Sequence, residues 1–195
     1  MTVSDSVRGA QTLLRFWFGE GEEYGSPRSF WFEKSPEVDR EIRERFYEDH
    51  ERAASGGLER WKADPRSCLA FILLLDQVPR NIFRDDPRAY ATDPMAREAA
   101  RSAVKAGFDA GLLPVERWFL YLPFEHSESM EDQRRSVELF ESLGGDEASV
   151  DVTYYARRHL EIIERFGRFP HRNRALGRES TSEEAAFLEE PGSSF

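Results

Sequence analysis

Cysteine is nearly absent from this sequence, which has a single cysteine, Cys68, among 195 residues. One thiol cannot form a disulfide within the chain, so a packed core has to stabilise the fold. Cys68 lies among apolar residues, a setting that fits a buried, unreactive thiol better than a nucleophile. The first five residues also lack the basic and then apolar pattern of a secretory signal. Both observations favour the reducing cytoplasm as the location.

Long apolar runs and an excess of positive charge are missing too. The longest apolar run, Cys68 to Leu75, ends at Asp76 and is shorter than the roughly 18 residues that a membrane-spanning helix needs. The net charge is -10, whereas nucleic-acid binding needs positive charge facing the phosphates. We therefore expect neither a membrane nor a nucleic acid as a partner.

Several motifs that carry known chemistry do not occur. The chain has no glycine-rich phosphate loop, no His-Glu-x-x-His, no paired Cys-x-x-Cys and no Gly-x-Ser-x-Gly. No motif therefore implies a cofactor, and the cofactor and any metal are left unknown. Patterns typical of strands hardly occur either.

Helix signals are abundant instead. Capping residues followed by proline, at Ser35-Pro36, Asp64-Pro65 and Asp93-Pro94, predict three helix starts. The run from Leu69 to Leu75 is apolar all round and predicts a central buried helix, with a short strand as the alternative. Thr181 with Glu184 matches a capping box.

The whole pattern predicts an all-α domain of about eight helices packed as antiparallel pairs. One helix is expected from about 147 to 166. We expect a single domain over residues 1–190 and a loose tail over 191–195. The aromatic content, 13% of residues, leaves a homodimer open without demonstrating one.

The first of three polar stretches follows the most apolar helix. Asp76 and Gln77 enter at the predicted end of this buried element, and Arg80 and Asn81 come directly after. A carboxylate in such a place must be paired or hydrogen-bonded. Either Asp76 and Arg80 form a pair that closes a helix end, or the stretch forms the floor of a pocket.

The second stretch contains His126 and Glu128. We expect Pro123 to end one helix and Ser127 or Ser129 to cap the next, which places both side chains in a tight connection. A histidine two residues from a glutamate can act as an acid–base pair or supply two metal ligands. The alternative is that these polar residues only cap a helix.

The third stretch is basic, although the rest of the chain is acidic. Five arginines and His171 lie between positions 165 and 178 with no acid among them. Arginines recognise carboxylates and phosphates through paired donors, so Arg168, His171, Arg172 and Asn173 could form an anion site. Alternatively, the arginines pair with acids from elsewhere. His159, on the apolar face of the long helix, is interpreted as a core histidine, with a pocket role as the alternative.

These stretches also carry a family resemblance. The pieces that match are Phe16-Trp17-Phe18-Gly19, Leu74 to Arg84, Leu122 to Glu128, Phe166 to Arg178, and Thr181 with Glu183-Glu184 before Phe187-Leu188. The chain resembles the bacterial family catalogued as domain of unknown function 924. The resemblance implies a right-handed helical array similar to tetratricopeptide-repeat domains, although no repeat was found in the sequence itself. It implies no reaction and no catalytic residues.

Three functions remain open. In the first, a polar pocket binds a small anionic molecule or a peptide carboxylate, and the ligand-binding residues are Gln77, Arg80, Asn81, Arg168, Arg172 and Asn173. In the second, the chain is a small hydrolase whose catalytic residues are Asp76, His126, Glu128 and His171, with Arg80 or Arg168 stabilising negative charge and a metal as a variant. In the third, the polar stretches only satisfy buried helix ends.

Overall fold

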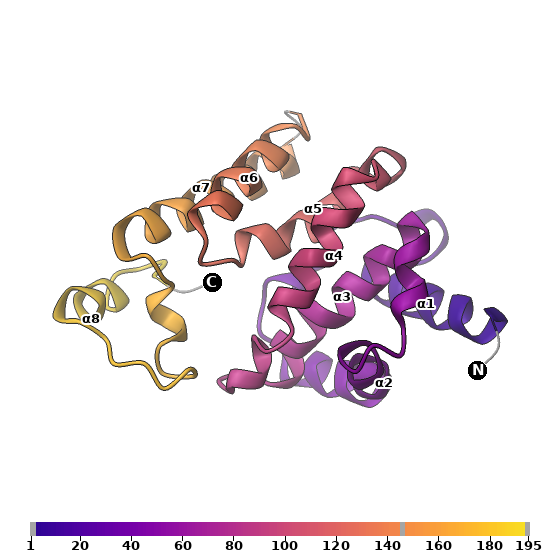
Figure 1. Ribbon diagram of the computed structural model, residues 1–195, viewed down its shortest axis with the longest axis horizontal. Coiled ribbons are helices and arrows are strands. Elements are labelled where there is room, and N and C mark those ends of the chain that lie inside the picture. The colour runs from indigo at the N-terminus through magenta and orange to yellow at the C-terminus, as the bar shows by residue number, and fades with distance from the viewer. Residues whose placement is uncertain (1–2, 145–146, 194–195) are drawn as a thin grey trace. The chain divides into compact units, whose positions relative to one another are not determined.

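The computed structural model describes residues 3–144 and 147–193, with the side chains of 9–144 and 150–193 (Figure 1). Within these residues the chain forms eight α-helices and six 3₁₀-helices and no β-strand, which confirms the predicted all-α class. By their contacts the residues fall into two compact units. The first unit consists of residues 1–84 and 88–123, and the second of 85–87 and 124–195. Each unit is described by itself.

The first unit contains α1 to α4 and most of α5. Their bounds are Val3–Phe18, Pro36–Ala54, Pro65–Ile82, Asp93–Lys105 and Pro114–Glu125. Two of the predicted caps are in place, since Ser35 accepts a hydrogen bond from Val38 N and Asp64 accepts one from Ser67 N. Pro36 and Pro65 each occupy the first helical position, where a missing N–H costs no hydrogen bond.

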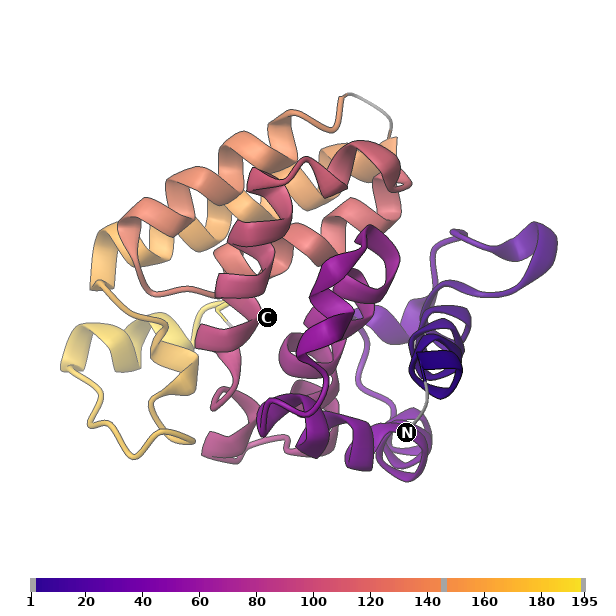
Figure 2. The same cartoon turned by 45° about the vertical axis from the view of Figure 1, so that its right-hand side comes forward.

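Helix α3 is the centre of the first unit, as its all-round apolar surface predicts. Helices α1, α2 and α4 pack against it (Figures 1 and 2). Every residue from Ser67 to Pro79 is buried. Cys68 is among them at 2% exposure, and burial raises the pKa of its thiol to about 11, so the thiol stays protonated near neutral pH.

The predicted end of α3 was wrong, because the helix continues through Pro79 to Ile82. A proline inside a helix removes the hydrogen bond to the carbonyl four residues before it. Here that carbonyl belongs to Leu75, and it accepts a hydrogen bond from the Thr92 hydroxyl at 2.6 Å. Asp76, Gln77 and Arg80 therefore lie on the helix itself rather than in a connection after it.

The second unit begins with the last two residues of α5. It then contains α6 (Met130–Glu141), α7 (Glu147–Phe166), a 3₁₀-helix (Pro170–Arg172) and α8 (Ser182–Leu188). Helices α6 and α7 pack along each other as a consecutive pair (Figures 1 and 2). The apolar core around α7 and α8 consists of Ile162, Ile163, Phe169 and Phe187.

Two local predictions in this unit have different outcomes. The capping box of Thr181 and Glu184 at the start of α8 is confirmed. The prediction that Pro123 ends a helix was wrong, because α5 runs on to Glu125. Proline removes one donor but does not prevent a further helical turn when packing favours it. The connection to α6 is therefore shorter than expected, and Glu125 belongs to the helix.

Three predictions about organisation stay predictions. A division by contacts does not decide whether 1–190 fold as one domain. Stacking like that of tetratricopeptide repeats is consistent with the helix pairs but is not established by them. Of the expected tail over 191–195, residues 191–193 are described, and Ser193 donates a hydrogen bond to the Leu188 carbonyl at 3.0 Å. Among the described residues, no helix has the length and apolarity to cross a membrane.

Candidate functional site

The predicted residues of the first unit form a hydrogen-bonded group along α3. Asp76 is fully buried, and the Gln77 amide donates to its Oδ2 at 2.7 Å. Arg80 donates to the Asp76 backbone carbonyl at 2.6 Å and lies 3.3 Å from Asp76 Oδ1. Its two terminal nitrogens also donate to Asp93 at 2.7 and 2.8 Å. Arg80 thus joins two carboxylates, and the Asp76–Arg80 pair lies within the helix.

Asn81 lies at the end of the same group. Its amide donates to the Gln77 carbonyl at 3.0 Å, one turn back, while its Oδ1 accepts from Arg84 at 3.2 Å. Arg84 also forms a double hydrogen bond with Asp39 of α2, at 2.5 and 2.7 Å. These contacts tie the last turn of α3 to α2, which is an architectural role. A ligand-binding role for Gln77, Arg80 and Asn81 stays a prediction.

Removal of the Arg80 charge should strongly destabilise the first unit. In Arg80→Met, Asp76 and Asp93 keep their charges without this partner, and breaking a buried pair in this way typically costs about 3–5 kcal/mol. Chemical denaturation of full-length protein measures the effect. Arg84→Met is the matched control, because its pair with Asp39 is more exposed, at 33% and 19%, and should be worth about 1 kcal/mol or less.

A second substitution separates charge from packing. Asp76→Asn in the Arg80→Met background removes one of the two stranded charges and should restore part of the lost stability. Equal losses in Arg80→Met and Arg84→Met, with no restoration by Asp76→Asn, would show that the buried charges do not govern the stability of this helix.

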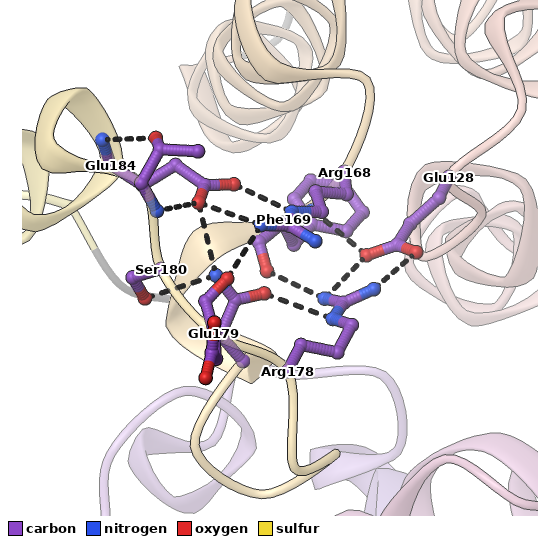
Figure 3. A network of polar contacts seen from close by, with 9 residues as sticks. Glu128, Arg168, Phe169, Arg178, Glu179, Ser180 and Glu184 are labelled. Carbon is purple, nitrogen blue, oxygen red and sulfur yellow. Dashed lines mark hydrogen bonds and ion pairs between the residues drawn. The ribbon is translucent and has the colours of Figure 1, made fainter.

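In the second unit, Glu128 anchors the loop that follows α7 (Figure 3). Its two oxygens accept hydrogen bonds from the Arg178 guanidinium at 2.9 and 3.0 Å, and Oε1 also accepts from Phe169 N at 2.8 Å. Burial by itself would raise the pKa of Glu128, but the hydrogen bonds from Arg178 and Phe169 lower it below its ordinary value. A carboxylate held in this way is a poor proton donor near neutral pH.

Glu184 anchors the other side of the same loop (Figure 3). Arg168 donates to its two oxygens at 2.6 and 2.8 Å and to the Glu179 carbonyl at 2.9 Å. Asn173 is 1% exposed; its amide donates to Ser180 Oγ at 3.1 Å, and its Oδ1 accepts from Arg178 at 2.9 Å. Arg168, Asn173 and Arg178 therefore hold residues 167–184 together. This is the pairing with distant acids that was the alternative to an anion site, and a ligand-binding role for Arg168 and Asn173 stays a prediction.

The Glu184 contacts should appear as a pH-dependent contribution to stability. The hydrogen bond from Arg168 is the main cause that lowers the pKa of Glu184 from 4.5 to about 2; burial opposes it, and the Thr181 N–H assists it. A carboxylate whose pKa is lowered by folding stabilises the native state above pH 4.5, and this contribution is lost as the pH falls towards 2.

The difference in unfolding free energy between wild type and Glu184→Gln should therefore be largest near neutral pH and shrink towards zero as the pH falls to about 2. Denaturation curves at a series of pH values measure it. Glu183→Gln is the control, since Glu183 is 63% exposed in its pair with Arg165, and we expect a small effect there. A difference that does not change with pH would contradict the assignment.

Three basic side chains gather around the buried ring of Phe169, and a fourth basic residue is joined to them through its backbone carbonyl. The rings of His159 and His171 lie 5.4 and 5.6 Å from it, and the Arg172 guanidinium lies over it at 4.4 Å. Arg172 also donates to the His126 carbonyl at 2.9 Å. We name these five residues (His126, His159, Phe169, His171 and Arg172) the Phe169 cluster. Phe169 is fully buried, Arg172 is 6% exposed, and His126 and His171 are half-buried.

His159 is the buried histidine of the Phe169 cluster. Its Nδ1 lies 2.9 Å from the Tyr155 carbonyl and 3.2 Å from Glu125 Oε1. Burial lowers the pKa of His159 well below its ordinary value, the hydrogen bond to Tyr155 opposes this, and the charges of His126, Arg172 and His171 lower the pKa further. The imidazole is therefore neutral near pH 7. Because both neighbours of Nδ1 are acceptors, its proton is on Nδ1 and Nε2 carries the lone pair.

The structure therefore brings together some predicted residues and leaves others in a separate unit. His126, His171 and Arg172 share the Phe169 cluster, and Glu128 holds its backbone through Phe169 N. Asp76, Gln77, Arg80 and Asn81 belong to the first unit. Among the described residues, no three or more His, Cys, Asp or Glu side chains are placed to hold a metal ion.

Sequence reasoning missed two members of this region. Glu125 was assigned no role, although its side chain is 5% exposed and contacts His159. Phe169 was treated as part of a basic stretch, although its ring organises the cluster. The contact between Glu125 and His159 leaves no local pattern in the sequence, because Glu125 lies on α5 and His159 lies on α7.

The first unit contains a surface hollow that no predicted site residue lines. Its volume is about 560 Å³, and its walls are formed by Gln11, Arg15, Glu20, Gly21, Tyr24 and Arg66. The signal in the sequence that could have indicated it is the glycine-rich turn after α1, Gly19-Glu20-Gly21.

Comparison with known proteins gives a family but no activity. The profile of a family described as "Bacterial protein of unknown function (DUF924)" matches residues 13–192. A solved structure of a protein of unknown function from Agrobacterium tumefaciens is similar, with a TM-score of 0.85 and 40% sequence identity. The match covers 95% of this chain and 99% of that one. No curated protein matches the chain.

Proposed function

This chain belongs to the DUF924 family of bacterial proteins of unknown function, and we propose that it binds a small anionic molecule or the carboxylate end of a peptide. The proposed site is the Phe169 cluster. The observation that carries the proposal is the gathering of two imidazoles and one guanidinium around a single buried ring, with His126 joined to the guanidinium through its backbone carbonyl. Groups of this kind donate hydrogen bonds to oxyanions from several directions.

The hydrogen bonds of the neighbouring carboxylates support an anion rather than a cation as the ligand. The carboxylates beside the cluster are already engaged, Glu128 by Arg178 and Glu125 by the His159 imidazole. His126 and His171 are half-buried residues. Protonation of either imidazole near neutral pH would add positive charge next to Arg172, and a bound anion would stabilise that charged form.

The proposal assigns direct contacts to His126, His171 and Arg172. Arg168, Asn173 and Arg178 act as positioning residues in it, because they hold the loop that carries His171 and Arg172. Asp76, Gln77, Arg80 and Asn81 have no part in this site. A cytoplasmic location fits the proposal, since the one cysteine is a buried thiol that needs no oxidising compartment.

Histidine signals in NMR spectra test the proposal directly. Addition of inorganic phosphate or acetate should shift the signals of His126 and His171 and raise their pKa values, because the anion stabilises the protonated imidazole. His50 is the internal control, as it lies in the first unit with its Nδ1 2.8 Å from the Leu74 carbonyl. A peptide with a free C-terminus, compared with its amidated form, distinguishes a peptide carboxylate from a small anion.

Variants link the response to these residues. His171→Gln and Arg172→Lys should each weaken anion binding about tenfold or more, the loss of roughly one charge-assisted hydrogen bond. Arg135→Gln is the control, because Arg135 is an exposed arginine of α6 paired with Glu138. If phosphate and acetate shift His50 as much as His126 and His171, or shift none of them, the cluster is not an anion site.

The second candidate function is hydrolysis, and the Glu125–His159 pair favours it. A neutral imidazole whose Nδ1 faces a carboxylate has the protonation state and orientation of a general base. In this version His159 would accept a proton and Arg172 would stabilise developing negative charge.

Hydrolysis of 4-nitrophenyl acetate tests this candidate. The rate should fall at least about a hundredfold in His159→Gln, the usual contribution of a general base, and should change little in His50→Gln. Because the pKa of His159 is lowered, the wild-type rate should not decline as the pH falls from 7 to about 6. A rate that equals that of buffer alone, or that survives His159→Gln, removes hydrolysis by this pair.

A further inference from the structure

The hollow of the first unit is a second candidate site, separate from the Phe169 cluster. Its walls come from α1, from the turn that follows α1, and from the first turn of α3. A volume of about 560 Å³ is in the range of pockets that bind metabolite-sized molecules. None of its residues belongs to the stretches that suggested a site in the sequence.

The turn after α1 exists because a glycine begins it. Gly19 has φ of +93°, and a Cβ at this position would lie 2.9 Å from the Glu23 carbonyl oxygen, too close for any other residue. The turn closes where Gly25 N donates to the Phe18 carbonyl at 2.7 Å. This local geometry brings Glu20 and Tyr24 to the wall of the hollow, on either side of Gly21.

Arg66 has defined partners beside the hollow, although its side chain is 52% exposed. It donates to Glu116 Oε1 at 3.1 Å and to the Tyr24 hydroxyl at 2.7 Å, and its guanidinium lies 5.2 Å from the centre of the Tyr24 ring. Glu116 itself is 1% exposed and also accepts from the Tyr24 hydroxyl at 2.6 Å and from Leu113 N at 2.9 Å. Arg66 uses two of its five guanidinium N–H groups in these hydrogen bonds, which leaves three for a ligand.

Tyr24 is fixed in its neutral form by the same contacts. Burial, and then the hydrogen bond to Glu116, raise the pKa of its phenol well above the ordinary value. The hydroxyl therefore keeps its proton for Glu116 and offers its oxygen to Arg66. A guanidinium that is positioned before a ligand arrives loses less side-chain entropy on binding, which favours affinity.

Arg15 is the second cation of the hollow. Within the part of the chain that the structure describes, it forms no ion pair and no side-chain hydrogen bond. Its side chain is exposed on α1. Arg15 therefore offers all five of its N–H groups to a ligand.

The balance of charges indicates the class of ligand. Arg15 and Arg66 contribute two positive charges to the wall. Glu116, which does not line the hollow, neutralises Arg66, and Glu20 supplies a negative charge on the wall. A site with no net charge but with separate cationic and anionic groups does not favour a simple anion. It matches a molecule that carries a carboxylate and an ammonium group on one small frame.

We propose that the hollow binds a small zwitterion of the α-amino acid class, whose carboxylate contacts Arg15 and Arg66 and whose ammonium faces Glu20. Gln11 and the Tyr24 ring form the rest of the wall. The polar lining favours an amino acid with a polar side chain. This inference does not depend on anion binding at the Phe169 cluster, which lies in the other unit.

Backbone NMR spectra of the full-length protein, recorded with a panel of common α-amino acids, test the proposal. Binding should shift the amide signals of Gly21, Tyr24 and Arg66 and leave those of His171 and Arg172 unchanged. L-glutamine is a suitable probe because two analogues each lack one of its charged groups: 4-aminobutanamide has no carboxylate and glutaramic acid has no ammonium. Each analogue should bind at least about tenfold more weakly than L-glutamine, the equivalent of one lost charge-assisted hydrogen bond.

Two exposed side chains allow substitution without risk to the fold. Arg15→Gln should weaken binding of L-glutamine and of glutaramic acid, which carry the carboxylate, whereas Glu20→Gln should weaken binding of L-glutamine and of 4-aminobutanamide, which carry the ammonium. Arg40→Gln, an exposed arginine of α2 outside the hollow, is the control and should bind as wild type does. Identical thermal unfolding of the variants verifies that they fold.

Three outcomes would overturn the proposal. Glutaramic acid that binds as tightly as L-glutamine would make the hollow an anion site. Binding that shifts amides elsewhere, or that is equal in Arg15→Gln and Arg40→Gln, would place the amino acid at another surface. No shift with any amino acid of the panel would leave the hollow without this ligand class, and would not affect the test of the Phe169 cluster.

Discussion

Buried carboxylates that need a positively charged or N–H partner organise both units of this chain. Moving an ionised carboxylate out of water without such partners raises the free energy of the folded state by several kcal/mol or more. Each buried carboxylate therefore requires a donor or a cation to pack beside it. Asp76 is matched by Arg80, Glu116 by Arg66 and Tyr24, and Glu184 by Arg168. In each case one partner is an arginine, whose planar fork satisfies several acceptors at once.

The same pairing determines which polar side chains remain available to a ligand. Arginines whose donors are used on carboxylates and carbonyls hold the architecture, as Arg168 and Arg178 do around the loop after α7. The groups left for a ligand lie next to these pairs: the imidazoles around Phe169 in the second unit, and Arg15 beside Arg66 in the first. The paired residues thus form the walls of each site, and the residues next to them are available to solvent or to a ligand. This arrangement suits binding, because a preorganised wall reduces the entropy lost when a ligand is held.

Two prolines illustrate how far local patterns can be trusted. Pro79 and Pro123 carry the ordinary signal of a helix end, yet α3 and α5 both continue past them. For Pro79 the reason is tertiary, since the Thr92 hydroxyl takes over the Leu75 carbonyl that the proline leaves without its helical donor. The capping signals at Ser35, Asp64 and Thr181 were reliable because donor and acceptor lie within one helical turn.

The sequence by itself therefore determined the helical class, the central place of α3, several helix starts and the unusual basic stretch, since all of these depend on neighbours in the chain. Only the tertiary structure decided which arginines form hydrogen bonds with carboxylates and carbonyls of the protein. Arg178 and Glu128 lie 50 positions apart, and Phe169 N and Glu128 lie 41 apart. No local period encodes such pairs, because they form where chain segments meet through apolar packing. The hollow beside Arg66 likewise depends on two chain segments, residues 11–24 and the first turn of α3, coming together.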